Sequence, residues 1–166
     1  FKVTYPFEST GGSIRNLNIV ESQKDIGINP LVVTPLNYPR MFGITEFELE
    51  EEVHGVRNIR LDTGDVNFQS ASYICDTLQL NTQLLAGLIR KEQPALLHAA
   101  SGYKGYELAS MAKVLSDHFS IPWIYEVRSF HEHTWTNDVF YANNSWHTKQ
   151  RILKENSLML GASHVV

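Results

Sequence analysis

Short apolar runs alternate with longer amphipathic stretches along the chain. Continuously apolar runs at residues 31–34, 95–100 and 122–127 predict strands that are covered on both faces, because a half-exposed strand would alternate apolar and polar positions. The opening residues 1–5 and the closing residues 163–166 have the composition of two further strands. The pattern therefore predicts several short strands, each followed by a helix.

Apolar residues with helical spacing lie between these runs. They predict helices over residues 13–25, over about 74–93, over 106–118 and over 146–158. Gly27 stands where a helix C-cap is expected, and Arg90 and Lys91 occupy a last turn, where positive charge suits the helix dipole. Two alternating runs around His54 and Gly55, over residues 47–61, predict a β-hairpin at a sheet edge. Repeated strand–helix units predict an α/β fold, a Rossmann-like, doubly wound and mostly parallel sheet with that edge hairpin.

Composition narrows the class of protein. The chain has 166 residues, of which 43% are hydrophobic and 19% charged, as in one ordinary globular domain. Its net charge of −4 argues against nucleic acid as a partner. The single cysteine, Cys75, predicts a reducing compartment and a cytoplasmic location, and its helical position predicts a core residue. Both ends fall within strand-like runs, so we expect a domain cut from a longer protein.

Polar residues gather where the predicted strands end. Gly11 and Gly12 follow the first run, and Ser13 stands where it could cap the helix that follows, so free backbone N–H groups could receive an anion. Glycine here would also permit positive φ and close approach of a ligand. His98, Ser101 and Tyr103 lie at or beyond the end of the run at 95–100, and Glu126 and Arg128 lie at or beyond the end of the run at 122–127. Because ligands bind beyond the carboxyl ends of parallel strands, these residues are the candidate site.

The same segments resemble a known family. The stretch Phe-Glu-Ser-Thr-Gly-Gly-Ser-Ile-Arg at 7–15, the strand at 31–35 and above all Ile-Pro-Trp-Ile-Tyr-Glu-Val-Arg at 121–128 are similar to the amino-terminal half of a family 4 (group 1) glycosyltransferase. The resemblance spans nearly the whole chain. It implies a GT-B fold, in which two Rossmann-like domains face a cleft, and a retaining transfer from a nucleotide-sugar, typically without a metal or other cofactor. The carboxyl-terminal domain that holds most donor contacts lies outside this chain.

The resemblance also implies partners and roles. The partners are a nucleotide-sugar donor, a sugar or lipid-linked acceptor and the absent carboxyl-terminal domain, and peripheral association with a membrane is compatible with them. Gly11 and Gly12 match the glycine loop that approaches the donor diphosphate and the acceptor, and Arg15 is a candidate partner for a phosphate or glycan. Glu126 and Arg128 match a strand end that faces the acceptor. His98 matches the first histidine of a His-x-His motif. Relatives place the second histidine of this motif in the cleft, near the reacting sugar, but this chain has Ala100 at that position. The role of the second histidine is left to Ser101, to another group or to no side chain.

Other interpretations stay open at this stage. His98 could be a hydrogen-bonded core residue, Glu126 and Arg128 could form a structural pair, and Arg15 and Arg40 could be ordinary surface arginines. The His-Glu-His sequence at 131–133 lacks a third ligand at a fixed spacing, which argues against a metal site. A sugar-nucleotide epimerase of the same fold and a non-catalytic glycan-binding module remain alternatives to a transferase. A nucleotide-dependent oxidoreductase is disfavoured, since the glycine fingerprint is absent.

Overall fold

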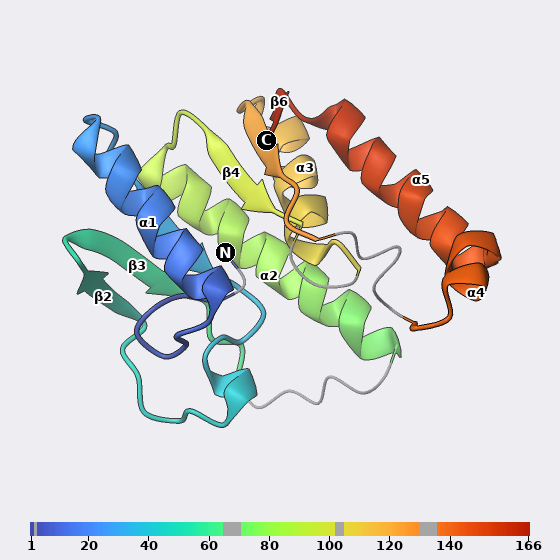
Figure 1. Cartoon of the computed structure of the whole chain (residues 1–166). Coiled ribbons are helices and arrows are strands. Elements are labelled where there is room, and N and C mark those ends of the chain that lie inside the picture. Colours follow the sequence, from blue (N-terminus) through green and yellow to red (C-terminus); the bar gives the residue numbers. More distant parts are fainter. Residues whose placement is uncertain (2, 65–70, 102–104, 130–135) are drawn as a thin grey trace. The chain divides into compact units, whose positions relative to one another are not determined.

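The computed structural model describes all residues except 2, 65–70, 102–104 and 130–135, with the backbone alone described for 71–74. The chain divides into two compact units, Phe1–Leu84 and Leu85–Val166, and each is described by itself. Helix α2 (Ala71–Glu92) contains the boundary between them. Each unit contains its own three-stranded sheet and helices, as Figure 1 shows. The protein is therefore α/β with small, partly parallel sheets.

The first unit combines helix α1 (Gly11–Asp25), strands β1 (Leu31–Thr34), β2 (Glu50–Val53) and β3 (Val56–Arg60), and the short helix η1 (Arg40–Phe42). The strand order is β1-β3-β2, with β1 parallel to β3 and β2 antiparallel to β3. His54 and Gly55 both have positive φ, 51° and 73°, as a two-residue hairpin turn requires. The predicted edge hairpin is confirmed.

The interior of this unit contains both apolar and charged groups. Val20, Val32 and Val56 pack together beneath α1. Arg60, at the end of β3, is also buried. Its guanidinium lies 4.7 Å from the centre of the Phe7 ring, contacts Glu51 and donates to the Glu48 carbonyl at 3.2 Å. The aromatic face and these oxygens compensate for taking the cation out of water.

The second unit contains β4 (Leu97–Ala100), α3 (Glu107–Phe119), β5 (Trp123–Glu126), α4 (Val139–Asn144), α5 (Trp146–Gly161) and β6 (His164–Val165). All of its strand pairs are parallel, in the order β4-β5-β6. Trp123 and Tyr125 of β5 are fully buried and pack with Ala109 of α3 and Leu158 of α5. These contacts fix the strand that leads to the candidate site.

Two sequence predictions about the start of the chain were wrong. The described residues of 1–5 form no strand, because the chain turns at Tyr5–Phe7, where Pro6 has no N–H to donate. Phe1 contacts β1 through its ammonium group, which donates to the Val33 carbonyl at 2.8 Å, and through packing against the cluster that includes Val32. Helix α1 begins two residues earlier than predicted, with Thr10 and not Ser13 as its N-cap. The first strand–helix–strand unit is therefore incomplete in the described residues.

Two other details differ from the sequence prediction. Cys75 is exposed on α2 rather than in a core, because a helical position fixes only the direction of a side chain, not what covers it. The short helix α4 was not predicted: its side chains are mostly exposed and give no apolar period, whereas the Asp138 carboxylate caps it by accepting from the Tyr141 N–H at 2.9 Å. The other predicted helices and strands are confirmed to within a few residues. Among the described residues, no helix has the length and apolar content needed to cross a bilayer.

Candidate functional site

The candidate site lies on β4 and β5, which are adjacent and parallel: Glu126 ends β5 and Arg128 follows it, whereas His98 is the second residue of β4. Ala100 and Glu126 are direct neighbours across the two strands. Side chains two residues apart along a strand share a face, so His98 lies on the same face as Ala100, and Arg128 extends the face of Glu126. The structure thus gathers His98, Glu126 and Arg128 into one cluster.

The carboxylate of Glu126 is the centre of this cluster. Its Oε2 lies 3.2 Å from His98 Nε2 and accepts a hydrogen bond from Arg128 Nη2 at 2.7 Å. The Glu126 side chain is 2% exposed, against 20% for His98 and 15% for Arg128. The two nitrogen-bearing groups are therefore closer to solvent than the carboxylate they contact.

Burial and charge act in opposite directions on Glu126. Burial by itself raises the pKa of the carboxyl, but hydrogen bonding to His98 and Arg128 and their charges outweigh it and lower the pKa to about 2. Glu126 is thus ionised throughout the physiological range. It can neither donate a proton nor reach solvent easily, so its available role is to fix the orientation of its two neighbours.

Glu126 and Arg128 could be acceptor contacts or a structural pair, and the geometry bears on both interpretations. The two side chains do form a buried ion pair, as the structural interpretation expects. Arg128 is nevertheless partly accessible, so a structural contact to Glu126 does not prevent its guanidinium from also contacting a ligand. His98 is likewise neither wholly internal nor wholly free, because its ring is in contact with Glu126.

Ser101 continues the ladder beyond β4. Its N–H donates to the Glu126 carbonyl at 3.1 Å, and its side chain is buried. The backbone at this strand end is therefore held in register with β5. Tyr103, the remaining candidate after β4, and the sequence at 131–133 lie outside the described residues. No group of three metal-ligating side chains occurs in the part of the chain that the structure describes.

Gly11 and Gly12 occupy the first turn of α1, not a left-handed loop. Thr10 precedes them with extended backbone, and the Ser13 hydroxyl accepts from the Thr10 N–H and donates to the Thr10 carbonyl, both at 2.9 Å. A Cβ added at Gly11 would meet no atom within 4 Å, and one at Gly12 would meet only Thr10 Oγ1 at 3.8 Å. The expectation that these glycines need positive φ is wrong, because an ordinary helical start forms here.

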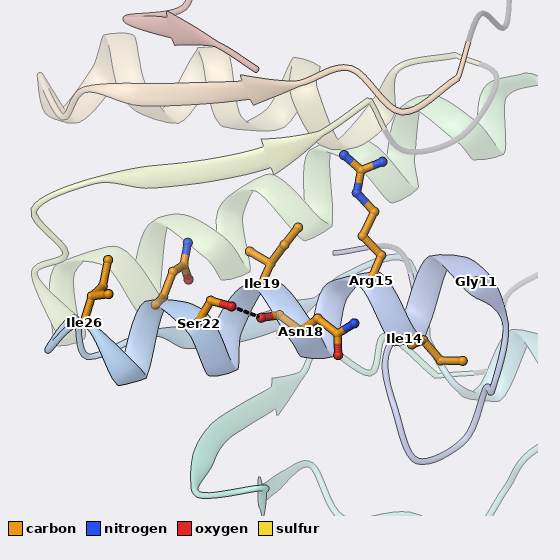
Figure 2. A pocket seen from close by; sticks show the side chains of 8 residues that line it. Gly11, Ile14, Arg15, Asn18, Ile19, Ser22 and Ile26 are labelled. Atoms are coloured by element: carbon orange, nitrogen blue, oxygen red, sulfur yellow. Dashed lines mark hydrogen bonds between the residues drawn. The ribbon is translucent and has the colours of Figure 1, made fainter.

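Arg15 extends from the exposed side of α1, as Figure 2 shows. It is one of the residues that line a shallow groove of about 600 Å³, together with Gly11, Ile14 and Ile19. The groove follows a single helix and its walls are mainly apolar. Gly11, Gly12 and Arg15 belong to the first unit, and the His98 cluster belongs to the second.

Arg40 has a structural partner. Its Nε and Nη2 donate to the two carboxylate oxygens of Asp62 at 3.0 and 2.6 Å. The hydrogen bond from Arg40 is the main cause of a lowered Asp62 pKa. This bidentate pair connects the segment after β1 with the segment after β3.

Sequence reasoning missed a second buried polar cluster. Glu155 of α5 is buried, and its two carboxylate oxygens accept from Tyr125 Oη at 2.7 Å and Tyr106 Oη at 3.2 Å. Burial, followed by contact with Glu155, raises the pKa of the Tyr125 hydroxyl. In the sequence, the only sign of this cluster is that Glu155, a charged residue, occupies a core-facing position of a helix. That position does not indicate which side chains contact Glu155.

A scan against protein-family models finds no match, and neither does a search of curated protein sequences.

Proposed function

We propose that this chain is the amino-terminal, acceptor-side domain of a retaining glycosyltransferase with a GT-B architecture. The observation that carries the proposal is the His98–Glu126–Arg128 cluster. Glu126 and Arg128 stand at the carboxyl end of β5, the edge where α/β proteins bind ligands, and His98 contacts Glu126 from within the adjacent parallel strand β4; the cluster includes the motif positions of the family resemblance. The finer features, a single doubly wound sheet and a donor-binding domain outside this chain, are part of this proposal.

In this proposal Arg128 binds the acceptor. A guanidinium offers several N–H donors in a fixed plane, which suits the hydroxyls of a glycan or the phosphate of a lipid-linked sugar. Glu126 holds one edge of that fork through the contact at 2.7 Å, so less rotational freedom is lost when the acceptor binds. Glu126 is therefore a positioning residue, and Arg128 is the group expected to touch substrate.

The donor side of the proposal rests on the start of α1. The first N–H groups of a helix have no partner within the helix and carry partial positive charge, which suits a diphosphate. Gly11 and Gly12 present no Cβ there, and the space in front of them is open. Arg15 is one turn further along the helix and supplies a positive charge.

Ala100 changes how such a site would work. The register places residue 100 directly opposite Glu126, so a histidine there would meet the carboxylate that now contacts His98 and Arg128. We propose that acceptor orientation by Arg128 and leaving-group stabilisation by the second domain supply the rate in place of that histidine.

The test is an assay of the full-length protein against a panel of nucleotide-sugars and acceptors. Products are identified by mass spectrometry, and their anomeric configuration by NMR. We expect transfer with retention, lost in Arg128→Ala and kept in Arg57→Ala, a matched change in an exposed ion pair. Conversion of the donor to its epimer without acceptor would support the epimerase alternative. Glycan binding without any turnover would support the binding-module alternative.

A further inference from the structure

Helix α5 has a row of large apolar side chains on the face opposite the one it buries. Trp146, Leu153 and Leu160 are 73%, 61% and 88% exposed. They are spaced by seven residues, and an α-helix drifts only about 20° over that distance, so the three lie along one line. The buried residues of the helix lie about half a turn away from this line: Thr148, Glu155 and Leu158. The row therefore takes no part in packing α5 onto the rest of the second unit.

Helix α4, which immediately precedes α5, extends this apolar surface. Val139, Phe140 and Tyr141 are all exposed, Phe140 by 79%. We call these three residues and the row on α5 the α4–α5 surface; the two helices follow one another near the end of the chain in Figure 1. Its side chains expose roughly 800 Å², on a scale where a whole aromatic side chain has about 150–250 Å². One partner in a protein–protein interface of standard size contributes about the same area, which is more than the apolar patches of most monomers.

The positions beside the row are polar but carry only one charge. Four exposed residues lie within about 60° of the row on the helical spacing of about 100° per residue: Lys149, Gln150, Asn156 and Ser157. Lys154 and Arg151 lie further round the helix, at about 100° and 160° from the row. A partner recognised by its negative charge needs several cations facing it, and this face offers Lys149 alone. The pattern therefore favours a partner that is as apolar as the row itself.

The row is symmetric about Leu153, so it is complementary to a second copy of itself. When two α5 helices pack antiparallel about a two-fold axis at Leu153, this residue meets the partner's Leu153. Trp146 then lies against the partner's Leu160, because both are seven residues from the axis. An isologous contact of this kind matches a large side chain with a large side chain at every position of the row.

The polar positions fit the same arrangement. In the antiparallel pair Lys149 lies beside the partner's Asn156, and Gln150 lies beside the partner's Ser157, because these positions are on the same side of the row and at nearly the same height. Lys149 is about 12 Å from the partner's Lys149 along the helix axis, at a rise of about 1.5 Å per residue. Antiparallel packing thus buries the row without bringing like charges together.

We propose that the α4–α5 surface joins two copies of the chain in an antiparallel, two-fold symmetric dimer. The driving force is the removal of the apolar row from water in both copies. Since the only charge beside the row is a lysine in each copy, salt screens a weak repulsion, and the dimer should be as stable at 1 M NaCl as at 0.1 M or more so. This inference is independent of the proposed sugar transfer.

Sedimentation velocity of the full-length protein is the first test. At about 0.1 mM protein, a dimer with a micromolar Kd is almost fully formed. Leu153→Asp should weaken the association at least about a hundredfold, because two carboxylates would then meet at the axis. The matched control is Val114→Asp, the same kind of change at a residue of α3 that is 57% exposed, and it should leave the dimer intact. Circular dichroism checks that both variants keep the fold.

Cysteine cross-linking tests the antiparallel geometry in a background from which the native cysteines, Cys75 among them, have been replaced by serine. Helices packed about 10 Å apart bring Cα atoms at the axis to about 5 Å, which a disulfide can span. Leu153→Cys should therefore form a cross-linked dimer under mild oxidation. Trp146→Cys alone should not, since the two copies of that position are about 21 Å apart, but mixed with Leu160→Cys it should.

A monomer at about 0.1 mM would overturn the proposal, as would a dimer that Leu153→Asp leaves unchanged. Cross-linking of Trp146→Cys alone as fast as Leu153→Cys would also overturn it, because the antiparallel pairing keeps the two copies of position 146 apart. Flotation with vesicles that contain phosphatidylglycerol tests the other occupant. Binding of a monomer to these vesicles that is lost at about 1 M NaCl would assign the surface to an anionic lipid instead.

Discussion

Replacing Glu126 with glutamine should destabilise the second unit by about 3 kcal/mol at pH 7. The pKa of this carboxyl is lowered from an ordinary 4.5 to about 2. One pKa unit corresponds to about 1.4 kcal/mol, which gives the expected magnitude for a side chain that is 2% exposed. Glutamine has nearly the same shape but no charge, so His98 and Arg128 would lose the group that compensates their burial.

The effect should depend on pH with a definite sign. Because the pKa of Glu126 is lower in the folded protein than in the unfolded chain, the carboxylate stabilises the fold above about pH 4.5. This contribution is lost as the pH falls toward 2, through the folded-state pKa. The difference between the unchanged protein and Glu126→Gln should therefore be largest near neutral pH and shrink steadily below pH 4.5.

Urea unfolding followed by near-ultraviolet circular dichroism measures this difference, since Trp123 and Tyr125 are buried beside the cluster. The control is Glu50→Gln, which removes a carboxylate from an ion pair whose Glu50 side chain is half exposed. It should cost less than about 1 kcal/mol, as surface pairs do. Equal losses in the two variants at pH 7, or a loss for Glu126→Gln that is the same at pH 3, would refute the reasoning.

Three further results are expected. Gly12→Ala should leave the free energy of unfolding unchanged or raise it by up to about 1 kcal/mol, because alanine favours a helical backbone more than glycine does. In the same urea titration, Gly55→Ala should lower the free energy of unfolding by about 1 kcal/mol, because a residue with a Cβ is strained at φ +73°. Tyr125→Phe should lower the free energy of unfolding by about 1–3 kcal/mol, since it leaves the Glu155 carboxylate with one fewer hydrogen-bond donor. Ultraviolet titration of the unchanged protein should show a tyrosine that does not ionise at its ordinary pH near 10, because the pKa of Tyr125 is raised. In the transferase assay, Arg128→Lys should raise the acceptor KM while leaving the donor KM nearly unchanged. Equal changes in the two KM values would indicate that Arg128 has only a structural role.

Local patterns correctly predicted most elements. The continuous apolar runs became β1, β4 and β5, and the His54–Gly55 turn produced the edge hairpin. These predictions succeeded because a strand or a tight turn depends on a few neighbouring residues. The prediction of a strand over residues 1–5 failed because strand formation also needs a partner that offers hydrogen-bonding groups over several residues, whereas the described residues of this segment are not paired with β1 as a strand.

Some features of the candidate site could be predicted from the sequence, whereas others depend on the tertiary structure. Its residue types and their positions at strand ends could be predicted from the sequence, including the shared face of Glu126 and Arg128. Their contact with His98 depends on the register between β4 and β5, which sets which side chains are opposite one another. The contact of Glu155 with two tyrosines depends on how α5 packs, and the sequence contains no direct signal for it.

The sequence by itself thus determined an α/β protein, most of its helices and strands and the chemistry available at the strand ends, because these follow from backbone preference and side-chain period. Only the tertiary structure decided which charges are buried and paired, how far the pKa of Glu126 is lowered and which apolar face of α5 stays exposed. The reason is physical. Burial and electrostatic energy depend on distances between groups that are remote along the chain, such as the 3.2 Å between His98 and Glu126.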